Sequence, residues 1–233
     1  MAERRLVIAI DGPAGAGKST LASRLARHYN YLNIETGAMY RALALKAIEN
    51  DISVDDEGAL CRLASQSRIE LQPSLEGNRV LLDTVDVSGR IREKDVTDAA
   101  SRVSVHPRVR SWMVERQRDM GKRGGVVMEG RDIGTAVFPD ADVKIFLDAA
   151  PEVRGNRRFK QVVGAAAPLA HPDPQDEKAK AIVAEMRERD QRDRTRATSP
   201  LVAASDAVVI DSTHLTLDQV IAQAEAVIDA KLK

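Results

Sequence analysis

The residues best suited to chemistry lie near the amino terminus, in the stretch LVIAIDGPAGAGKSTLASRLARHY. Gly12 is followed after four residues by Gly17, Lys18 and Ser19, with an apolar run before this loop and an amphipathic pattern after it. Glycines let successive backbone N–H groups turn inward, and the start of the next helix adds about half a positive charge. The pattern is typical of a phosphate-binding P-loop, in which a solvent-facing Lys18 reaches the β and γ phosphates and the Ser19 hydroxyl binds Mg²⁺.

A glycine-rich turn with a merely solvated lysine is the alternative, and the order of apolar run, loop and helix disfavours it. A P-loop by itself is compatible with nucleotide switches, motors and small-molecule kinases. The guanine-recognition motif N-K-x-D and the transporter signature Leu-Ser-Gly-Gly are both absent from the sequence. The other polar clusters must therefore distinguish these classes.

A second anion site is predicted by ETGAMYR, residues 35 to 41. Thr36 and Arg41 stand there at the expected start of a helix, and a helix amino terminus beside an arginine attracts anions. For Thr36 taken alone, an ordinary helix N-cap is the simpler interpretation.

Two further clusters combine arginines with carboxylates. Glu129, Arg131 and Asp132 directly follow a short apolar run, at the strand end where α/β sheets bind ligands. In RERDQRDRTR, residues 187 to 196, Arg189 and Asp193 are spaced so that a helix would place them on one face with Arg196. Such a run is usually a solvated helix, but its five arginines outnumber its three acids, which leaves positive charge for another anion.

The elements that must position these residues alternate between short apolar runs and helical patterns. This alternation predicts an α/β fold, a doubly wound parallel sheet of about five strands. The expected strands are 6–10, 126–128, 143–147 and 207–210 beside a strand-like run before Thr36, and the expected helices are 19–29, one opening at Pro151, and 217–228. Residues 68–87 alternate with period two around a turn at 76–78, which predicts a small antiparallel insert. The proline-rich stretch 164–176 predicts a loop or lid.

Composition narrows the function classes. The 233 residues carry 35 basic and 35 acidic side chains, so no overall charge favours nucleic acid or an anionic membrane. No run approaches the roughly 20 apolar residues of a membrane span, and the single cysteine, Cys61, suits a reducing cytosol as a small buried side chain. We therefore expect a cytoplasmic protein that binds neither nucleic acid nor membrane.

Together these motifs closely resemble the bacterial cytidylate kinases, the CMP/dCMP kinases among the nucleoside monophosphate kinases. The resemblance runs from Val7 to about Ile228 and also includes DVSGRIR (86–92), AASRVSVHPRVR (99–110), GRDIGTAVFPDA (130–141), IFLDA (145–149) and ERDQRDRTRATSPL (188–201). It implies transfer of the γ-phosphoryl group of ATP to CMP or dCMP with Mg²⁺ as cofactor, usually by a monomer. It also implies a core of residues 1–35, 106–150 and 197–233, a monophosphate-binding region at 36–105 and a lid region at 154–196.

The resemblance assigns expected roles to individual residues. ATP and Mg²⁺ would be held by Gly12, Pro13, Ala14, Gly15, Ala16, Gly17, Lys18, Ser19 and Thr20, with Arg157 and Arg158 as lid arginines over ATP. The acceptor phosphate would be held by Thr36, Arg41 and Arg131, the cytosine by Ser101, Arg110 and Asp132, and the ribose and phosphate by Arg189, Asp193 and Arg196. Lys18, Arg131, Arg189 and Arg196 are the expected catalytic cations.

The chemistry of these side chains fits the same activity. Phosphoryl transfer needs positioning and positive charge, and arginines supply permanently charged, bidentate donors. A carboxylate such as Asp132 accepts from the cytosine amino group and would face a carbonyl oxygen in uracil.

Two positions depart from the family's usual residues, because Glu129 and Glu35 stand where aspartate is common. At 129 the longer acid would orient Mg²⁺ through water. Kinases of UMP, shikimate or dephospho-coenzyme A, and an ATP-dependent regulatory module, are the alternatives that sequence leaves open.

Overall fold

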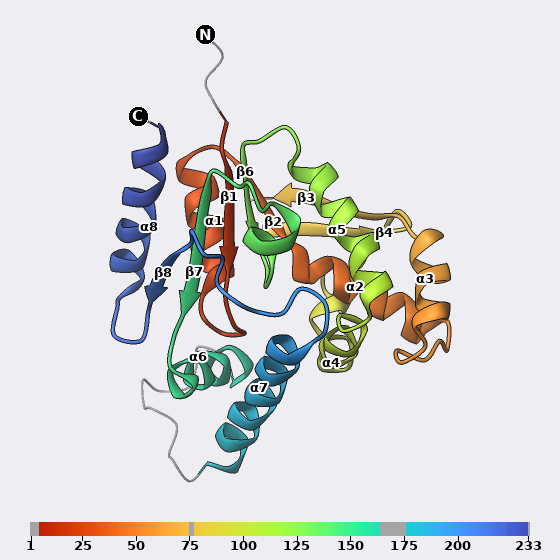
Figure 1. The fold of residues 1–233 in the computed structure, drawn as a ribbon. Coiled ribbons are helices and arrows are strands. Elements are labelled where there is room, and N and C mark those ends of the chain that lie inside the picture. The colour runs from red at the N-terminus through yellow and green to blue at the C-terminus, as the bar shows by residue number, and fades with distance from the viewer. Residues whose placement is uncertain (1–4, 75–76, 164–175, 233) are drawn as a thin grey trace.

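The computed structural model describes residues 5–74, 77–163 and 176–232 of the chain. Its centre is a parallel sheet of five strands, as predicted, and the structure gives their order as β2-β6-β1-β7-β8 (Figure 1). The strands are β1(Val7–Asp11), β2(Leu32–Glu35), β6(Val126–Glu129), β7(Val143–Asp148) and β8(Val208–Asp211). Ile10 of β1 pairs with Glu129 on one side and Ile145 on the other, so the polar residues that end these strands lie at one edge.

Helices cover both faces of this sheet, which explains why its strands are apolar on both sides. On one face, α1(Lys18–His28) and α8(Leu217–Leu232) bury Leu25 and Ala224 against Val127 and Ile145. On the other, α5(Pro107–Gly121) and a π-helical turn at Ile133–Val137 pack against Met128 and its neighbours. The prediction of a doubly wound sheet is therefore confirmed.

A second apolar cluster lies beside the sheet. It is built from α2(Thr36–Glu49), α3(Glu57–Ser65), α4(Lys94–Val103), part of α5 and two strands of a small antiparallel sheet, β3(Ile69–Ser74) and β4(Gly77–Leu82). The third strand of that sheet, β5(Val85–Asp86), is exposed. The antiparallel insert is confirmed, but its predicted turn is misplaced. Gly77 already pairs with Ser74, and Asn78 with Pro73, so both belong to β4, and residues 75–76 lie outside the described part. Cys61 is half-buried against this cluster.

Two helices lie beyond the carboxyl ends of the strands, α6(Pro151–Val163) and α7(Glu177–Thr195) (Figure 1). Of the predicted lid stretch, residues 164–175 lie outside the described residues. The prediction that one helix carries Arg196 is wrong, because α7 ends at Thr195 and Arg196 is extended, with φ −62° and ψ 143°. The chain turns back there, since the Leu201 N–H donates to the Asp193 carbonyl at 2.8 Å in place of a helical partner.

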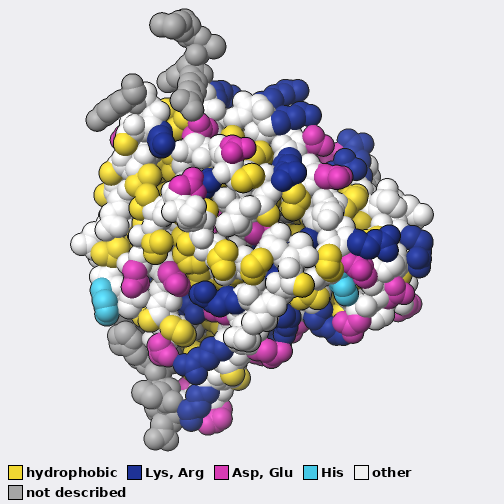
Figure 2. Space-filling view, in the orientation of Figure 1, with side chains coloured by type: hydrophobic (Ala, Val, Ile, Leu, Met, Phe, Trp, Pro, Cys, Tyr) yellow, Lys and Arg dark blue, Asp and Glu magenta, His cyan; other side chains and the backbone are white. Residues whose placement is uncertain are grey.

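Basic and acidic side chains are interspersed over the face seen in Figure 2. No helix within the described ranges is long and apolar enough to span a bilayer.

Candidate active site

A large cleft of about 1420 Å³ opens at the carboxyl ends of the strands, between α6 and α7 on one side and α2 and α4 on the other. All but two of the predicted site residues line it. These are Ala14, Gly15, Ala16, Gly17, Lys18, Ser19, Thr20, Thr36, Arg41, Ser101, Arg110, Glu129, Arg131, Asp132, Arg157, Arg158, Arg189, Asp193 and Arg196. The two exceptions, Gly12 and Pro13, begin the loop and are not among the residues that line the cleft.

The P-loop begins where β1 ends, and its backbone needs glycine. Gly12 has φ +147°, and a side chain there would collide with the Leu147 carbonyl oxygen of β7. The prediction that Lys18 faces solvent is wrong. Its side chain is 6 % exposed and its Nζ donates to the Pro13 carbonyl at 2.7 Å, because it curls back over the loop that it closes.

Asp11, the last residue of β1, ties the loop to the segment after β6. Its carboxylate accepts from the backbone N–H of Ile133 at 2.8 Å and of Gly134 at 2.7 Å. Burial raises the pKa of Asp11 to about 6, because the two N–H donors offset only part of the lost hydration. This contact holds the residues after β6, among them Arg131 and Asp132, at the edge of the cleft.

Five cations from five segments face one another in the cleft, and we call them the cation cluster: Lys18, Arg41, Arg131, Arg158 and Arg189. Burial lowers the pKa of Lys18, and the nearby charge of Arg131 lowers it further. Burial also lowers the pKa of Arg189 to about 10, with contributions from Arg131, Arg41 and Arg158. The Nε atoms of Arg41 and Arg189 are buried without a hydrogen-bond partner. Such a group of like charges is suited to a multiply charged anion.

Two acids lie beside the cation cluster. Burial raises the pKa of Glu129, and the charge of Glu35 raises it further. The Ser19 hydroxyl is hydrogen-bonded to the Glu129 carboxylate, whereas Glu129 Oε1 is buried without a partner. Among the described residues, no group of three or more His, Cys, Asp or Glu could hold a metal unaided. The Ser19 hydroxyl and the Glu129 carboxylate supply oxygen ligands, the kind taken by a hard cation such as Mg²⁺, which keeps waters and takes its other ligands from phosphates.

Thr36 serves neither as an N-cap nor as a free hydroxyl. It is the first residue of α2, and its Oγ1 donates to the Glu129 carbonyl at 2.7 Å. Arg41, one turn further along α2, is ion-paired with Glu35. The start of α2 is thereby fixed against the end of β6.

The far end of the cleft is polar and almost fully buried. Arg110, 2 % exposed, is ion-paired with Asp132, and its guanidinium lies over the ring of Tyr40 at 5.6 Å. Burial opposes the charge of Arg110, but Tyr40 and Asp132 outweigh it, so the pKa of Arg110 is raised. Arg196 Nη2 lies 3.6 Å from the Asp132 carboxylate and has no hydrogen-bond partner.

Asp193 joins this end of the cleft to the cation cluster. It accepts from Arg131 Nε at 2.9 Å and lies 3.6 Å from Arg196. Burial raises its pKa, but Arg131, Arg189 and Arg196 together outweigh burial, and the pKa of Asp193 is lowered. Although Arg196 lies beyond the helix end, the structure brings it together with Asp193 as the sequence suggested.

The opposite end of the cleft lies against α6. Arg157 donates to the Ala16 carbonyl at 3.1 Å and to the Ser212 carbonyl at 2.9 Å, while Arg158 reaches Gln161. Leu215, Leu217 and Val220 also line this end and were not predicted. They follow β8, so the rule that ligands bind at strand ends would have found them.

Three residues that contact the site were not predicted from the sequence: Arg192, Arg154 and Asp190. Arg192 donates from Nη1 to the Ser101 hydroxyl at 2.6 Å, and Arg154 and Asp190 contact the P-loop backbone. Arg192 and Asp190 belong to the charged run that was singled out, but spacing alone does not show which of its side chains turn inward.

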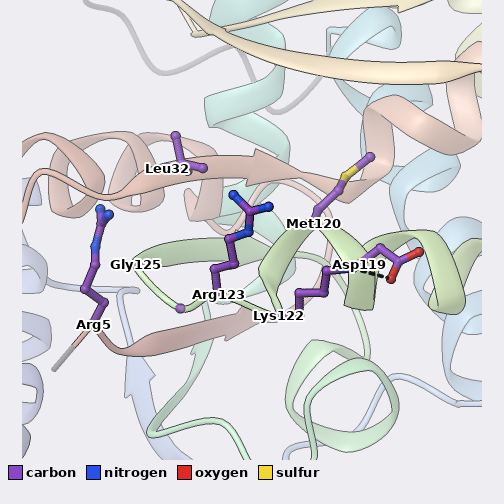
Figure 3. Close-up of a pocket in the computed structure, with 8 residues that line it drawn as sticks. Arg5, Leu32, Asp119, Met120, Lys122, Arg123 and Gly125 are labelled. Atoms are coloured by element: carbon purple, nitrogen blue, oxygen red, sulfur yellow. Dashed lines mark hydrogen bonds and ion pairs between the residues drawn. The ribbon is translucent and has the colours of Figure 1, made fainter.

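A second, smaller hollow of about 360 Å³ lies at the opposite edge of the sheet (Figure 3). It is lined by Arg5, Leu32, Asp119, Met120, Lys122, Arg123, Gly124 and Gly125, none of which is a predicted site residue. Its lysine is paired with Asp119, and Arg5 donates to the Asn30 carbonyl. The cleft is thus the place where the predicted chemistry is concentrated.

Comparison with known proteins identifies related chains. Residues 8–230 match the family model described as cytidylate kinase. The cytidylate kinase of Solibacter usitatus (strain Ellin6076) is 47 % identical over 94 % of this chain and 90 % of its own length. That of Enterococcus faecalis (strain ATCC 700802 / V583) is 47 % identical, covering 97 % of each chain. That of Aeromonas salmonicida (strain A449) is 44 % identical, covering 97 % of this chain and 95 % of its own.

A solved structure supports the fold alone. The crystal structure of an uncharacterized protein from Eubacterium ventriosum ATCC 27560 superimposes with a TM-score of 0.50 at 14 % identity, covering 97 % of this chain and 99 % of that one. The family model and the curated relatives both span nearly the whole chain, including the P-loop and the arginines of the cleft. This chain belongs to the cytidylate kinase family.

Proposed function

We propose that the cleft transfers the γ-phosphoryl group of ATP to CMP or dCMP, giving ADP and CDP or dCDP. The observation that carries the proposal is the cation cluster, which lies between the P-loop and the buried pair of Arg110 and Asp132. A donor triphosphate on the loop and a monophosphate whose base reaches that pair would both present their phosphates to the same cations. Membership of the cytidylate kinase family supports the same activity.

Each end of the cleft has its own substrate. The backbone of residues 12–20 and Lys18 hold the ATP phosphates, and the apolar side chains after β8 lie where its base would be. Arg41 and Arg131 hold the acceptor phosphate with the start of α2, where Thr36 fixes the backbone. Arg189 bridges acceptor and transferred phosphoryl, because it lies among the other arginines of the cluster.

Base and sugar recognition lie beyond the phosphate. Asp132 accepts from the cytosine amino group, Arg110 donates to its ring nitrogen or carbonyl, and Ser101 adds a hydroxyl. Asp193 faces the ribose hydroxyls between Arg131 and Arg196. These buried groups already pair with one another, so they are held in place before the nucleotide arrives.

Mg²⁺ fits the oxygens at the loop. Ser19 would bind it directly and Glu129 through water, and the ion would supply charge to the β and γ phosphates when bound. The unpartnered Oε1 of Glu129 is the atom available for such a water.

The chain's own contribution to the reaction is electrostatic and geometric. The attacking oxygen belongs to a phosphate that is already an anion at neutral pH, so no side chain has to remove a proton from it. Lys18, Arg131, Arg189 and Arg196 offset the charge that gathers on the transferred group and its neighbours. The arginine fork holds oxygens in a fixed direction, which aligns donor and acceptor.

We also propose that the chain divides as the sequence suggested and acts as a monomer. The core would be residues 1–35, 106–150 and 197–233, with monophosphate binding at 36–105 and a lid region at 154–196. Sedimentation of the purified chain at the concentrations used for the assays would test the oligomeric state.

The activity is tested by product analysis with CMP, dCMP, UMP and AMP as separate acceptors. We expect ADP to form together with CDP or dCDP, and little product from UMP or AMP. ADP formation only with another acceptor would indicate a different kinase, and ATP binding or hydrolysis without any phosphorylated acceptor would indicate a regulatory module. Arg41→Ala and Arg131→Ala should raise the KM for CMP and lower kcat, with less effect on the KM for ATP.

A further inference from the structure

One residue of the P-loop, Ala14, is held through both of its backbone polar groups by a buried ion pair. The Ala14 N–H donates to Asp190 Oδ1 of α7 at 3.3 Å, and the Ala14 carbonyl accepts from Arg154 Nη1 of α6 at 2.9 Å. Arg154 Nη1 also donates to Asp190 Oδ2 at 2.6 Å. The pair therefore closes a ring around Ala14.

The ring is anchored and shielded from water. Arg154 is 4 % exposed and Asp190 is 7 % exposed. Arg154 Nε donates to the Ala149 carbonyl at 2.9 Å, just after β7. The next loop residue, Gly15, has φ +73°, a conformation that favours glycine, and a Cβ there would also lie 2.6 Å from the methyl carbon of Met186 and 3.2 Å from Arg154 Cβ.

The partner of the loop lies on the same helix as the acceptor-side residues. Asp190 directly follows Arg189 of the cation cluster and precedes Asp193 by less than one turn of α7. A helix is stiff over one turn, so the position of Ala14 and the positions of Arg189 and Asp193 depend on each other. Neither Arg154 nor Asp190 is among the residues that line the cleft, and both reach the loop through the Ala14 backbone.

From this arrangement we propose that Arg154 and Asp190 are positioning residues that couple the ATP loop to the acceptor side of the cleft. Phosphates that order the P-loop also order the Ala14 backbone, and through Asp190 they set the position of α7. Acceptor binding to Arg189 and Asp193 sets the same helix and so favours the loop conformation that holds ATP. Each substrate then strengthens the binding of the other, as linkage requires. The inference rests on the proposed function, because it takes the two ligands to be ATP and CMP.

The test is calorimetric binding of CMP to the full chain, with and without saturating AMP-PNP, a nonhydrolysable ATP analogue. In the parent we expect AMP-PNP to strengthen CMP binding roughly tenfold, within the usual range of coupling. Asp190→Asn leaves one acceptor oxygen for two donors, so it should reduce this enhancement to about twofold or less and lower kcat more than it raises the KM for CMP.

A second variant separates positioning from stability. Arg154→Met combined with Asp190→Leu replaces the buried pair by apolar side chains, an exchange that buried pairs often tolerate without loss of stability. We expect the doubly substituted chain to melt near the parent temperature but to show no enhancement of CMP binding by AMP-PNP. If the doubly substituted chain is as stable as the parent and AMP-PNP still strengthens its CMP binding as in the parent, the proposal is overturned, because the pair would then serve the fold alone.

Asp206→Asn is the matched control. It removes the charge of the carboxylate that pairs with another buried cation, Lys144, which lies outside the cleft and also donates to the Pro139 carbonyl. It should lower the melting temperature and leave the enhancement unchanged. If AMP-PNP strengthens CMP binding to Asp190→Asn as much as to the parent, the inference is wrong, although the parent would still form CDP. If the parent forms no CDP, the proposed function is wrong.

Discussion

Replacing Asp132 by asparagine tests whether this carboxylate distinguishes cytosine from uracil. Cytosine offers an amino donor and an unprotonated ring nitrogen, and uracil offers a carbonyl and a ring N–H in the same places. With UMP, Asp132 would face an acceptor and Arg110 would face a donor. Each mismatch at a buried group costs about 1 to 3 kcal/mol, so the parent should prefer CMP by roughly a hundredfold or more in kcat/KM.

The amide of Asp132→Asn can present either a donor or an acceptor, so one of the two mismatches disappears. The ratio of kcat/KM for CMP to that for UMP should therefore fall by about tenfold, while kcat/KM for CMP itself decreases. The substitution also leaves Arg110, which is 2 % exposed, without its charged partner. Breaking such a pair costs about 3 kcal/mol, or about 10 °C in Tm for a chain of this size.

Asp193→Asn is the control for that loss of stability. Asp193 is equally buried and is paired with Arg131 and Arg196, so its removal should lower Tm and reduce turnover of both nucleotides. Its CMP to UMP ratio should stay at the parent value. If Asp132→Asn changes Tm and overall turnover but leaves the ratio as in the parent, Asp132 stabilises Arg110 and does not select the base.

Three further substitutions test the loop. Lys18→Ala should lower kcat by about a hundredfold or more, as the loss of a donor that stabilises transition-state charge does in other enzymes. It should leave the fold intact, because the hydrogen bond from Lys18 to the Pro13 carbonyl is local to the loop. Near-normal turnover would refute the P-loop assignment. Gly12→Ala should weaken AMP-PNP binding and reduce stability by about 1 to 3 kcal/mol, since its Cβ would collide with the Leu147 carbonyl; a calorimetric affinity equal to the parent's would contradict this. Asp11 has a pKa raised to about 6 in the fold, so its protonated form stabilises the fold at low pH and this contribution is lost as pH rises from about 4 through 6. We would measure the free energy of unfolding of the parent and of Asp11→Asn by denaturant titration. The difference between the two should therefore change by up to about 3 kcal/mol in favour of the variant as pH rises over that range. A difference that does not depend on pH would contradict this prediction.

The strands and the loop were predictable because their determinants are local. Five apolar residues before Asp11 and the glycines after it specify β1 and the P-loop from adjacent positions. The antiparallel insert was equally visible, since period-two alternation needs no distant partner. Its turn was misplaced by about two residues, because the alternation does not state where pairing stops.

The contacts between distant segments were not predictable in the same way. A lysine after a glycine-rich loop is expected to face solvent, but Lys18 folds back onto Pro13, a contact that depends on the curvature of the loop. Arg196 was assigned to a helix because its spacing matched, whereas the bond from Leu201 to Asp193 ends α7 one residue earlier. Arg154 and Asp190 are 36 positions apart, and only the packing of α6 against α7 shows that they meet.

Helix α2 carries Thr36 and Arg41 and buries side chains on nearly every side. Ala42, Leu43, Ala44 and Leu45 follow one another in the chain, and each has no exposed surface. Because this helix is packed on nearly all sides, it cannot separate from one neighbour alone. Its amide hydrogens should therefore exchange with solvent only when the whole second apolar cluster opens. Hydrogen exchange of the α2 amides would then report the stability of the whole cluster formed with α3 and α4. Substitutions deep in that cluster should weaken CMP binding only when they leave the cluster open for a substantial fraction of the time, because the apparent Kd rises as the closed fraction falls.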